Sequence, residues 1–210
     1  MMKTLLTVAV IAACGTLALS AQDLKLPAPD TKGGKPLMQC MALRKSSRSF
    51  DPAKKLPPQI LANIFYAADG ITRKDGRKTV PTARNAQNQM IYAATADGLW
   101  LYQPKTNTLK KLGSKDIRAL CGGQKFHAKA PLVLIYVAEP AKVGNTPAQQ
   151  QNYAANHAGY ASQNVYLYAA SEGLATVVCA MVDRAALAKA MNLPAGQQIM
   201  YSQPIGYPGR

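Results

Sequence analysis

Seven consecutive apolar residues, Leu132-Val133-Leu134-Ile135-Tyr136-Val137-Ala138, limit the folds open to this chain of 210 residues. A strand with one face in solvent alternates apolar and polar side chains, whereas this run is apolar at every position. The run therefore predicts a strand that is buried at the centre of a sheet.

The segments before this strand predict a helix followed by a hairpin. Residues 56–70 predict the helix, because two prolines suit its first turn, apolar residues recur at helical spacing and a glycine ends it. Residues 90–95 and 99–102 predict two strands joined by a tight Ala-Asp-Gly turn, and residues 109–112 extend this hairpin.

The segments after the central strand predict a long helix and further strands. Residues 148–171 predict the helix, whose alanines permit close approach of a neighbouring element, and Gly173 ends it. Residues 175–182 and 199–205 predict two strands on either side of a last helix, which follows the capping residue Asp183. The pattern indicates an α+β fold with a mostly antiparallel central sheet, flanked by helices of which one is long and central.

The start of the chain predicts an export signal. Lys3 precedes an apolar stretch that is too short to span a membrane, and small residues follow it. We therefore expect residues 1–21 to be a signal peptide and the protein to be exported, to the periplasm. A lipoprotein signal modified at Cys14 is the alternative, and it is the one route to membrane contact that we expect. Residues 22–36, rich in Pro, Lys and Gly, predict an exposed leader before a domain over residues 37–210.

The predicted mature chain is strongly basic. The full sequence has 25 lysines and arginines against 10 carboxylates, so removal of Lys3 changes the net charge from +15 to +14. Such a charge attracts anions, among them phosphorylated cofactors, nucleic acid and anionic lipid. The basic residues are spread along the chain without zinc-finger spacing or a ribonucleoprotein motif, so we expect no nucleic-acid partner.

Other residue types exclude several classes of site. Cys40, Cys121 and Cys179 are odd in number and widely spaced, which predicts no disulfide framework, and Cys179 in its apolar run predicts a buried small hydrophobe. The sequence has two histidines and no close pair of carboxylates, so we expect neither a metal site nor a two-carboxylate hydrolase. It also has no nucleophile elbow and no Gly-rich phosphate loop.

A basic-hydroxyl cluster, Arg44-Lys45-Ser46-Ser47-Arg48-Ser49-Phe50, predicts an oxyanion site. Guanidinium groups bind phosphate through two parallel hydrogen bonds, and the hydroxyls add short-range donors. A solvated basic surface is the alternative for such a run. A second polar segment, Pro81-Thr82-Ala83-Arg84-Asn85-Ala86-Gln87, follows the first predicted long helix.

In their order along the chain, these segments resemble the FMN-dependent nitroreductase-like family, including its SagB-type dehydrogenase branch. The basic-hydroxyl cluster matches the family's opening Arg-x-Ser-x-(Arg/Lys)-x-Phe motif, and residues 81–87 resemble its Pro-Ser-x-x-Asn-x-Gln stretch. Residues 56–70 are similar to its helix ending in Ala-Ala-x-Gly, and residues 162–174 to its long helix with a Gly-Leu ending. The resemblance spans about residues 38–210. It implies a homodimer with two FMN sites at its interface, where the long helix lies.

The resemblance also implies which residues bind FMN. Arg44, Ser46 and Arg210 are expected at the phosphate, with Lys45 beside them at a position where many relatives have His. Arg48 is expected at the pyrimidine edge of the isoalloxazine, where a cation stabilises the reduced flavin. The other expected contacts, along the ring and the ribityl chain or from a loop, are Pro81, Thr82, Ala83, Asn85 and Lys125. A solvated loop cation is the alternative for the last of these, and a frayed terminus is the alternative for Arg210.

The implied function is an FMN-dependent oxidoreductase that passes electrons in two steps from a small donor to a quinone, nitro compound or other small acceptor. Because the flavin performs the redox chemistry, no catalytic side chain is predicted. Many relatives have a Glu-Gly pair that falls by position at Ala180-Met181, and export separates the protein from cytoplasmic NAD(P)H. We therefore expect either that another donor reduces the flavin or that the native reaction is not that of a nitroreductase. The alternative function is a non-catalytic exported binding protein that has kept the fold and lost the flavin.

Overall fold

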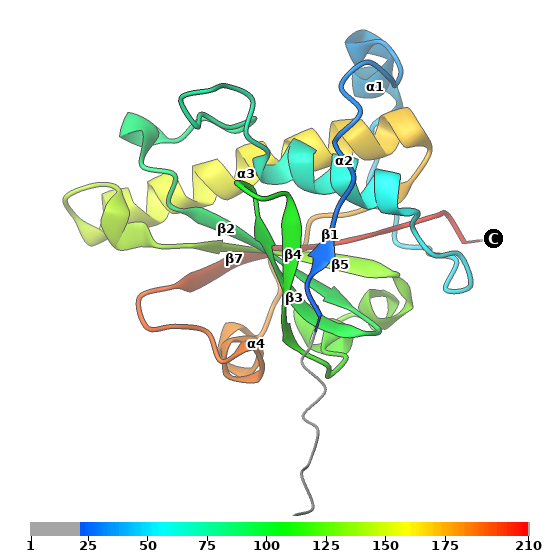
Figure 1. The fold of residues 1–210 in the computed structure, drawn as a ribbon. Helices are drawn as coiled ribbons and strands as arrows, with labels where there is room; N and C mark the ends of the chain where they lie inside the picture. Colours follow the sequence, from blue (N-terminus) through cyan, green and yellow to red (C-terminus); the bar gives the residue numbers. More distant parts are fainter. Residues whose placement is uncertain (1–21, 210) are drawn as a thin grey trace, which may run out of the picture.

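The predicted central strand, β5 (Leu132–Ala138), lies inside a seven-stranded sheet, between β2 and β7, in the computed structural model, which describes residues 22–209 (Figure 1). All of its residues are buried. The strand order is β1-β4-β3-β2-β5-β7-β6, and neighbouring strands are antiparallel throughout. The other strands are β1 (Leu24–Lys25), β2 (Gln89–Thr95), β3 (Gly98–Gln103), β4 (Thr108–Gly113), β6 (Ala175–Thr176) and β7 (Gln198–Gly206).

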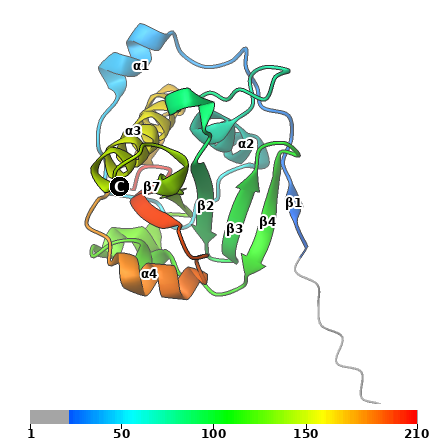
Figure 2. The same ribbon diagram turned by 90° about the vertical axis from the view of Figure 1, so that its left-hand side faces the viewer.

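Helices cover both faces of this sheet. The helices α2 (Pro58–Asp69) and α3 (Pro147–Glu172) lie on one face, and α4 (Arg184–Met191) lies on the other (Figures 1 and 2). The short helix α1 (Leu37–Leu43) packs against α3. Within residues 22–209, no helix is both long and apolar enough to cross a membrane. Short 3₁₀ turns complete the helical segments: η1 (Ala83–Asn85), η2 (Arg118–Cys121), η3 (Lys125–Lys129) and η4 (Pro140–Lys142).

The pleat of β5 divides its side chains between two cores. Leu134 and Tyr136 belong to the core beneath α2 and α3, whereas Ile135 and Val137 belong to the core that includes Leu187 of α4. Successive side chains of a strand point to opposite faces, so each core takes every second residue. The continuous apolar run is therefore explained, and the predicted α+β fold with an antiparallel central sheet is confirmed.

The ends of α3 follow from the residues around it. The Thr146 hydroxyl accepts a hydrogen bond from the Gln149 N–H at 3.3 Å, which caps the first turn. Gly173 ends the helix with φ of 69°, a left-handed conformation that glycine adopts without steric cost. The helix therefore runs one residue beyond the predicted 148–171 at each end.

The predicted strand over residues 175–182 is wrong for most of its length. Only β6 pairs continuously with β7, and beyond it Cys179 forms an isolated bridge with Ser202 through hydrogen bonds of 2.8 and 3.0 Å. Since β6 is the last strand of the sheet, no further strand holds the residues that follow it. The chain leaves the ladder after Thr176, and within residues 177–182 it exposes Ala180 and Met181.

Residues 22–36 expose most of their side chains and are also fixed to the domain. Their strand β1 pairs with β4, and Leu26 is buried. At the other end, the Lys35 N–H donates to the Ser171 hydroxyl at 2.8 Å, so the segment reaches the C-terminal end of α3. The predicted signal peptide over residues 1–21, with the lipidation alternative at Cys14, lies outside the described residues.

A buried ion pair fixes the loop between α2 and β2. The Lys78 ammonium lies 2.6 Å from the Asp69 carboxylate, and both side chains are at most 10% exposed. Burial raises the pKa of Asp69 to about 6, although the Lys78 charge opposes this shift. Because either charge alone would be left buried without a partner, the pair holds the start of the segment that leads to residues 81–85.

Candidate cofactor site

The basic-hydroxyl cluster, residues 44–50, is an extended segment at the β6 edge of the sheet. The Ser47 N–H donates to the Thr176 carbonyl of β6 at 2.9 Å. The Ser49 carbonyl accepts a hydrogen bond from the Gly209 N–H at 3.1 Å. These two contacts fix the backbone of the cluster between β6 and the segment that follows β7.

Tyr166 of α3 joins the cluster to the segment after β6. The Val178 N–H donates to the Tyr166 hydroxyl at 2.9 Å, and this hydroxyl lies 2.9 Å from Ser46 Oγ. Since a backbone N–H can only donate, the Tyr166 oxygen accepts from Val178, and its own proton is free for Ser46. The Arg44 guanidinium lies over the same ring, 5.3 Å from its centroid, within the range of a cation–π contact.

The three cations of the cluster carry uncompensated charge. Within residues 22–209, Arg44, Lys45 and Arg48 form no ion pair with a carboxylate. Lys45 and Arg48 are exposed, and Arg44 is half-buried against Tyr166. Three like charges on five consecutive residues repel one another, so an anion bound beside them would be stabilised.

Three cavities lie beside the cluster. One of them, of about 580 Å³, has a lining that includes residues 48–52, Phe126 and Lys129, and the other two border β6 or the segment after it. The first of these two, of about 470 Å³, is lined by Lys45, Ser47 and Tyr166 together with the end of α3 and the segment after β7. The second, of about 240 Å³, is lined by Arg48, residues 178–181 and the turn before η3. Tyr166 lines the first cavity and bonds to a residue that lines the second, so the two linings are connected.

Two titratable side chains of the second cavity are neutral at pH 7. Cys179 is half-buried and not fully buried as predicted; burial raises the pKa of its thiol, and Arg48 only partly offsets this. Burial lowers the pKa of His127, whose Nδ1 lies 2.9 Å from the Gln124 carbonyl. The charge in this cavity is therefore that of Arg48.

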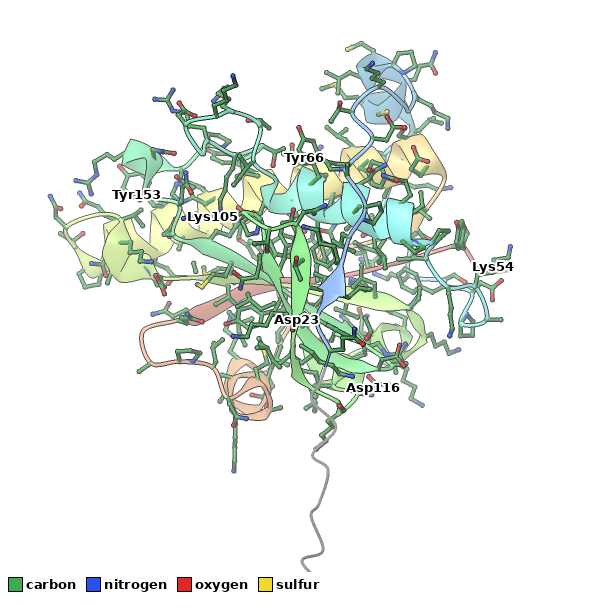
Figure 3. All side chains as sticks on the ribbon, in the orientation of Figure 1. Asp23, Lys54, Tyr66, Lys105, Asp116 and Tyr153 are labelled. Atoms are coloured by element: carbon green, nitrogen blue, oxygen red, sulfur yellow. The ribbon has the colours of Figure 1, made fainter. Side chains whose placement is uncertain are left out.

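The second predicted group, Pro81, Thr82, Ala83 and Asn85, lies elsewhere on the chain. Its residues line neither cavity. The Ala83 N–H donates to His157 Nε2 at 2.9 Å, which places this group beside the N-terminal half of α3. Tyr153, one turn before His157, and Lys54, just after the basic cluster, lie at opposite ends of the molecule in Figure 3. One copy of the chain thus does not bring the two predicted groups together.

Lys125 and Arg210 complete the predicted set. Lys125 is exposed at the start of η3 and does not line the second cavity, although its neighbour Gln124 does. Arg210 lies outside the described residues. Gly209, the last described residue, lines the first cavity.

The nitroreductase family model matches residues 41–207, which include the basic cluster, α3, the lining of the second cavity and most of the lining of the first. This chain belongs to the nitroreductase family. A relative from Methanocaldococcus jannaschii, provisionally named a nitroreductase, is 30% identical over 165 residues, which cover 73% of this chain and 82% of the relative. The family assignment agrees with the order of motifs in the sequence.

Solved structures show the same fold. A provisionally named nitroreductase from Ralstonia eutropha JMP134 has a TM-score of 0.85 and 33% identity, and the match covers 99% of this chain and 97% of that one. Another, from Desulfovibrio desulfuricans and solved in complex with FMN, has a TM-score of 0.62 and 19% identity, covering 85% and 89%. At that identity the second likeness concerns the fold alone.

The side chains of this nitroreductase-family site suit a phosphorylated ligand. Phosphate requires unpaired cations and hydroxyl or N–H donors, which Arg44, Lys45 and Ser46 supply from adjacent positions. The first cavity, at about 470 Å³, lies within the range of roughly 300–1,000 Å³ that is usual for cofactor pockets. No group of three or more His, Cys, Asp or Glu residues within residues 22–209 could hold a metal ion.

Tyr166 is the site residue that the sequence alone did not reveal. An aromatic residue at helical spacing usually lies in the core or at an interface, so the spacing of Tyr166 alone does not indicate a site residue. The one available signal was position: Tyr166 precedes Gly173 by two turns, at the end of α3 that meets the basic cluster.

Removal of the Tyr166 hydroxyl should loosen the site without disrupting the fold. Tyr166→Phe leaves the Val178 N–H and the Ser46 hydroxyl without this partner, which should lower the free energy of unfolding by about 1 kcal/mol. Hydrogen exchange should also become faster over residues 174–182, measured on peptides by mass spectrometry. The control is Tyr160→Phe, a half-exposed tyrosine of the same helix. Unchanged exchange in Tyr166→Phe would show that the hydroxyl does not hold this segment.

Proposed function

We propose that this nitroreductase-family protein is an FMN-dependent oxidoreductase that passes electrons from a donor to a quinone, nitro compound or other small acceptor. The observation that carries the proposal is the set of unpaired cations Arg44, Lys45 and Arg48 on a fixed backbone beside the first and second cavities. A protein of the same fold solved with FMN supports the same function. Assignment to the SagB-type dehydrogenase branch is part of the proposal and rests on the order of the sequence motifs.

The free cations suit the two charged parts of FMN. Arg44, Lys45 and Ser46 suit the phosphate dianion, together with Arg210, because guanidinium and hydroxyl groups donate to phosphate oxygens. Arg48 lies in a cavity whose lining includes no carboxylate, so it can stabilise negative charge on the pyrimidine side of the ring. Bound FMN supplies the redox chemistry, and these residues bind, orient and shield it.

The backbone after β6 supplies hydrogen-bond donors to the same place. Ala180 and Met181 are exposed and line the second cavity. Their N–H groups donate no hydrogen bond within the described part of the chain. A backbone donor requires no particular side chain, so a ring nitrogen can be bound here although the glutamate of many relatives is absent.

The binding residues of one copy form two half-sites at different ends of α3. Residues 44–48 lie beside Tyr166, and residues 81–85 lie beside His157, nine residues earlier and about 14 Å away along a helix. We propose a homodimer in which two copies of α3 pack antiparallel about a two-fold axis. Such an axis brings residues 81–85 of one copy to residues 44–48 of the other.

The exposed surfaces of α3 and α1 suit this contact. α3 has no charged residue from Pro147 to Ser171, although the chain has a net charge of +15. It exposes Tyr153 and Tyr160 at 39% and 50%. α1 adds four exposed apolar side chains, those of Leu37, Met38, Met41 and Leu43. An uncharged surface with tyrosine and methionine side chains is typical of the core of a protein interface.

A charge on this surface should separate the two copies. Tyr160→Glu buries a carboxylate in the proposed interface, so we expect a monomer in sedimentation velocity and a loss of FMN retention, because each site needs both copies. The control is Lys105→Glu, an exposed residue of the β3–β4 turn. A monomeric wild type, or a dimeric Tyr160→Glu variant that retains FMN, would contradict the interface.

The cofactor proposal is tested by an absorbance spectrum after incubation with FMN and desalting. The wild type should retain about one FMN per chain. The double variant Arg44→Ala with Arg48→Ala should lower the FMN affinity by at least about 100-fold, because two charge-assisted contacts are lost. The matched control, Lys105→Ala with Lys110→Ala, removes the same charge near the opposite sheet edge and should retain FMN. A folded but colourless wild type would favour the alternative, a binding protein without flavin.

The electron donor follows from the proposed export to the periplasm. We propose that the exported protein uses a donor other than NAD(P)H, since NAD(P)H is cytoplasmic and Ala180-Met181 replaces the usual Glu-Gly pair. Anaerobic titration of the FMN-loaded protein with NADH should reduce the flavin only slowly. Rapid reduction at physiological NADH concentrations would overturn this part of the proposal.

A further inference from the structure

His157 is a buried histidine that contacts the half-site of residues 81–85 directly. It is 2% exposed, and its Nε2 accepts the Ala83 N–H at 2.9 Å. On the other side of the ring, Nδ1 lies 2.7 Å from Asn88 Oδ1, and Asn88 is 1% exposed. The imidazole therefore links α3 to both ends of the segment between η1 and β2.

These contacts determine the protonation state of the ring. A backbone N–H can only donate, so His157 Nε2 must present its lone pair to Ala83. A neutral imidazole then carries its proton on Nδ1 and donates to Asn88 Oδ1. The Asn88 Nδ2 group must in turn point away from the ring, and it has no hydrogen-bond partner within residues 22–209. The Asn88 Nδ2 group lacks a partner because the amide is oriented with its oxygen toward His157.

The segment that His157 holds has an unfavourable backbone. Arg84 and Asn85 have φ of 53° and Gln87 has φ of 44°, in the left-handed region that residues with a Cβ rarely adopt. Apart from the histidine, the segment is held by hydrogen bonds within itself, among them that of the Gln87 N–H to Thr82 Oγ1 at 3.0 Å, and by Gln87 Nε2, which donates to the Gly76 carbonyl at 3.1 Å. Such a conformation persists only when its surroundings enforce it.

We propose that His157 is a positioning residue that holds residues 81–87 in the shape of a cofactor half-site, and does so only while its ring is neutral. The proposal rests on the proposed function for the identity of the cofactor. Protonation would give the ring a second N–H, on Nε2, which would face the Ala83 N–H. Two donors cannot bond to each other, so the hydrogen bond between Ala83 and His157 would be lost.

The surroundings of the ring favour the neutral form. Burial lowers the pKa of His157, so the imidazole is neutral at pH 7. The phenols of Tyr153 and Tyr160 flank it, with ring centroids 6.2 and 6.4 Å away. The charged side chains of η1 and η4, Arg84 and Lys142, and that of Glu139 beside η4 make no hydrogen bond to the ring. Asp69 of α2, which packs against α3, is paired with Lys78.

The test compares His157→Gln, which can keep an acceptor near the Nε2 position, with His157→Leu, which removes it. The first measurement needs no cofactor: hydrogen exchange at residues 81–88 in the full-length mature protein, at pH 7.5 and 5.0. At each pH the variants are compared with one another. We expect residues 81–88 to exchange faster in His157→Leu than in His157→Gln at both pH values, and faster in the wild type than in His157→Gln only at pH 5.0. His157→Gln should be protected at both. Equal protection of the three proteins at both pH values would overturn the proposal.

The second measurement is the dissociation constant of FMN for the same proteins. His157→Leu should weaken binding about tenfold, equivalent to one lost buried hydrogen bond, whereas His157→Gln should stay within about threefold of the wild type at pH 7.5. The FMN phosphate also titrates near pH 6, which weakens binding in every variant at pH 5.0. The contribution of the imidazole is therefore the extra FMN affinity that the wild type loses between pH 7.5 and 5.0, compared with His157→Gln. Wild-type affinity in His157→Leu would overturn the positioning role. If the exchange differences appear but the wild type binds no FMN, the positioning role is supported and the cofactor assignment fails.

Discussion

The burial of β5 on both faces is the constraint on which the rest of the structure depends. A strand that is apolar at every position is stable only between two layers, so the chain must supply a cover to each face. α3 provides much of one cover, and its buried small side chains, Ala154, Ala158, Ala161 and Ala169, let the helix approach the sheet closely. Because small residues occupy its inner face, the larger Tyr153 and Tyr160 lie on the outer face, where a second copy can reach them.

The candidate site is built from groups that the sheet leaves unpaired. β6 is only two residues long, and the backbone after it leaves the ladder. An edge strand with free N–H and C=O groups promotes unwanted association unless something covers it. Ser47 supplies one hydrogen bond to β6, and Tyr166 supplies another to the segment beyond it. The N–H groups of Ala180 and Met181 donate no hydrogen bond within the described residues, and Arg48 of the basic cluster lines the same cavity.

The sequence predicted the elements that a local pattern defines, and it missed those that depend on neighbours. The apolar run of β5 and the capping residue Asp183 of α4 predict their elements whatever packs against them. Residues 177–182 are apolar enough for a strand, but apolarity does not tell whether a partner strand is present. Tyr166 has the same spacing as a core tyrosine, and only its contact with Ser46 distinguishes it. The motifs at residues 44–50 and 81–87 could be found in the sequence, but not the separation between them within one chain.

The absence of charge along α3 serves both the sheet and the proposed dimer. In a chain with a net charge of +15, a lysine on the outer face would meet the same charge of its symmetry mate across a two-fold axis. Glutamine, asparagine and tyrosine carry no charge and so avoid this repulsion, and their polar groups can still hydrogen-bond to water when the chain is not paired. His157 fits the same condition, because burial keeps its ring neutral while the ring nitrogens bond to Ala83 and Asn88. An imidazolium at this position would add a charge to a helix that has none before its last residue, and would release the strained segment beside it.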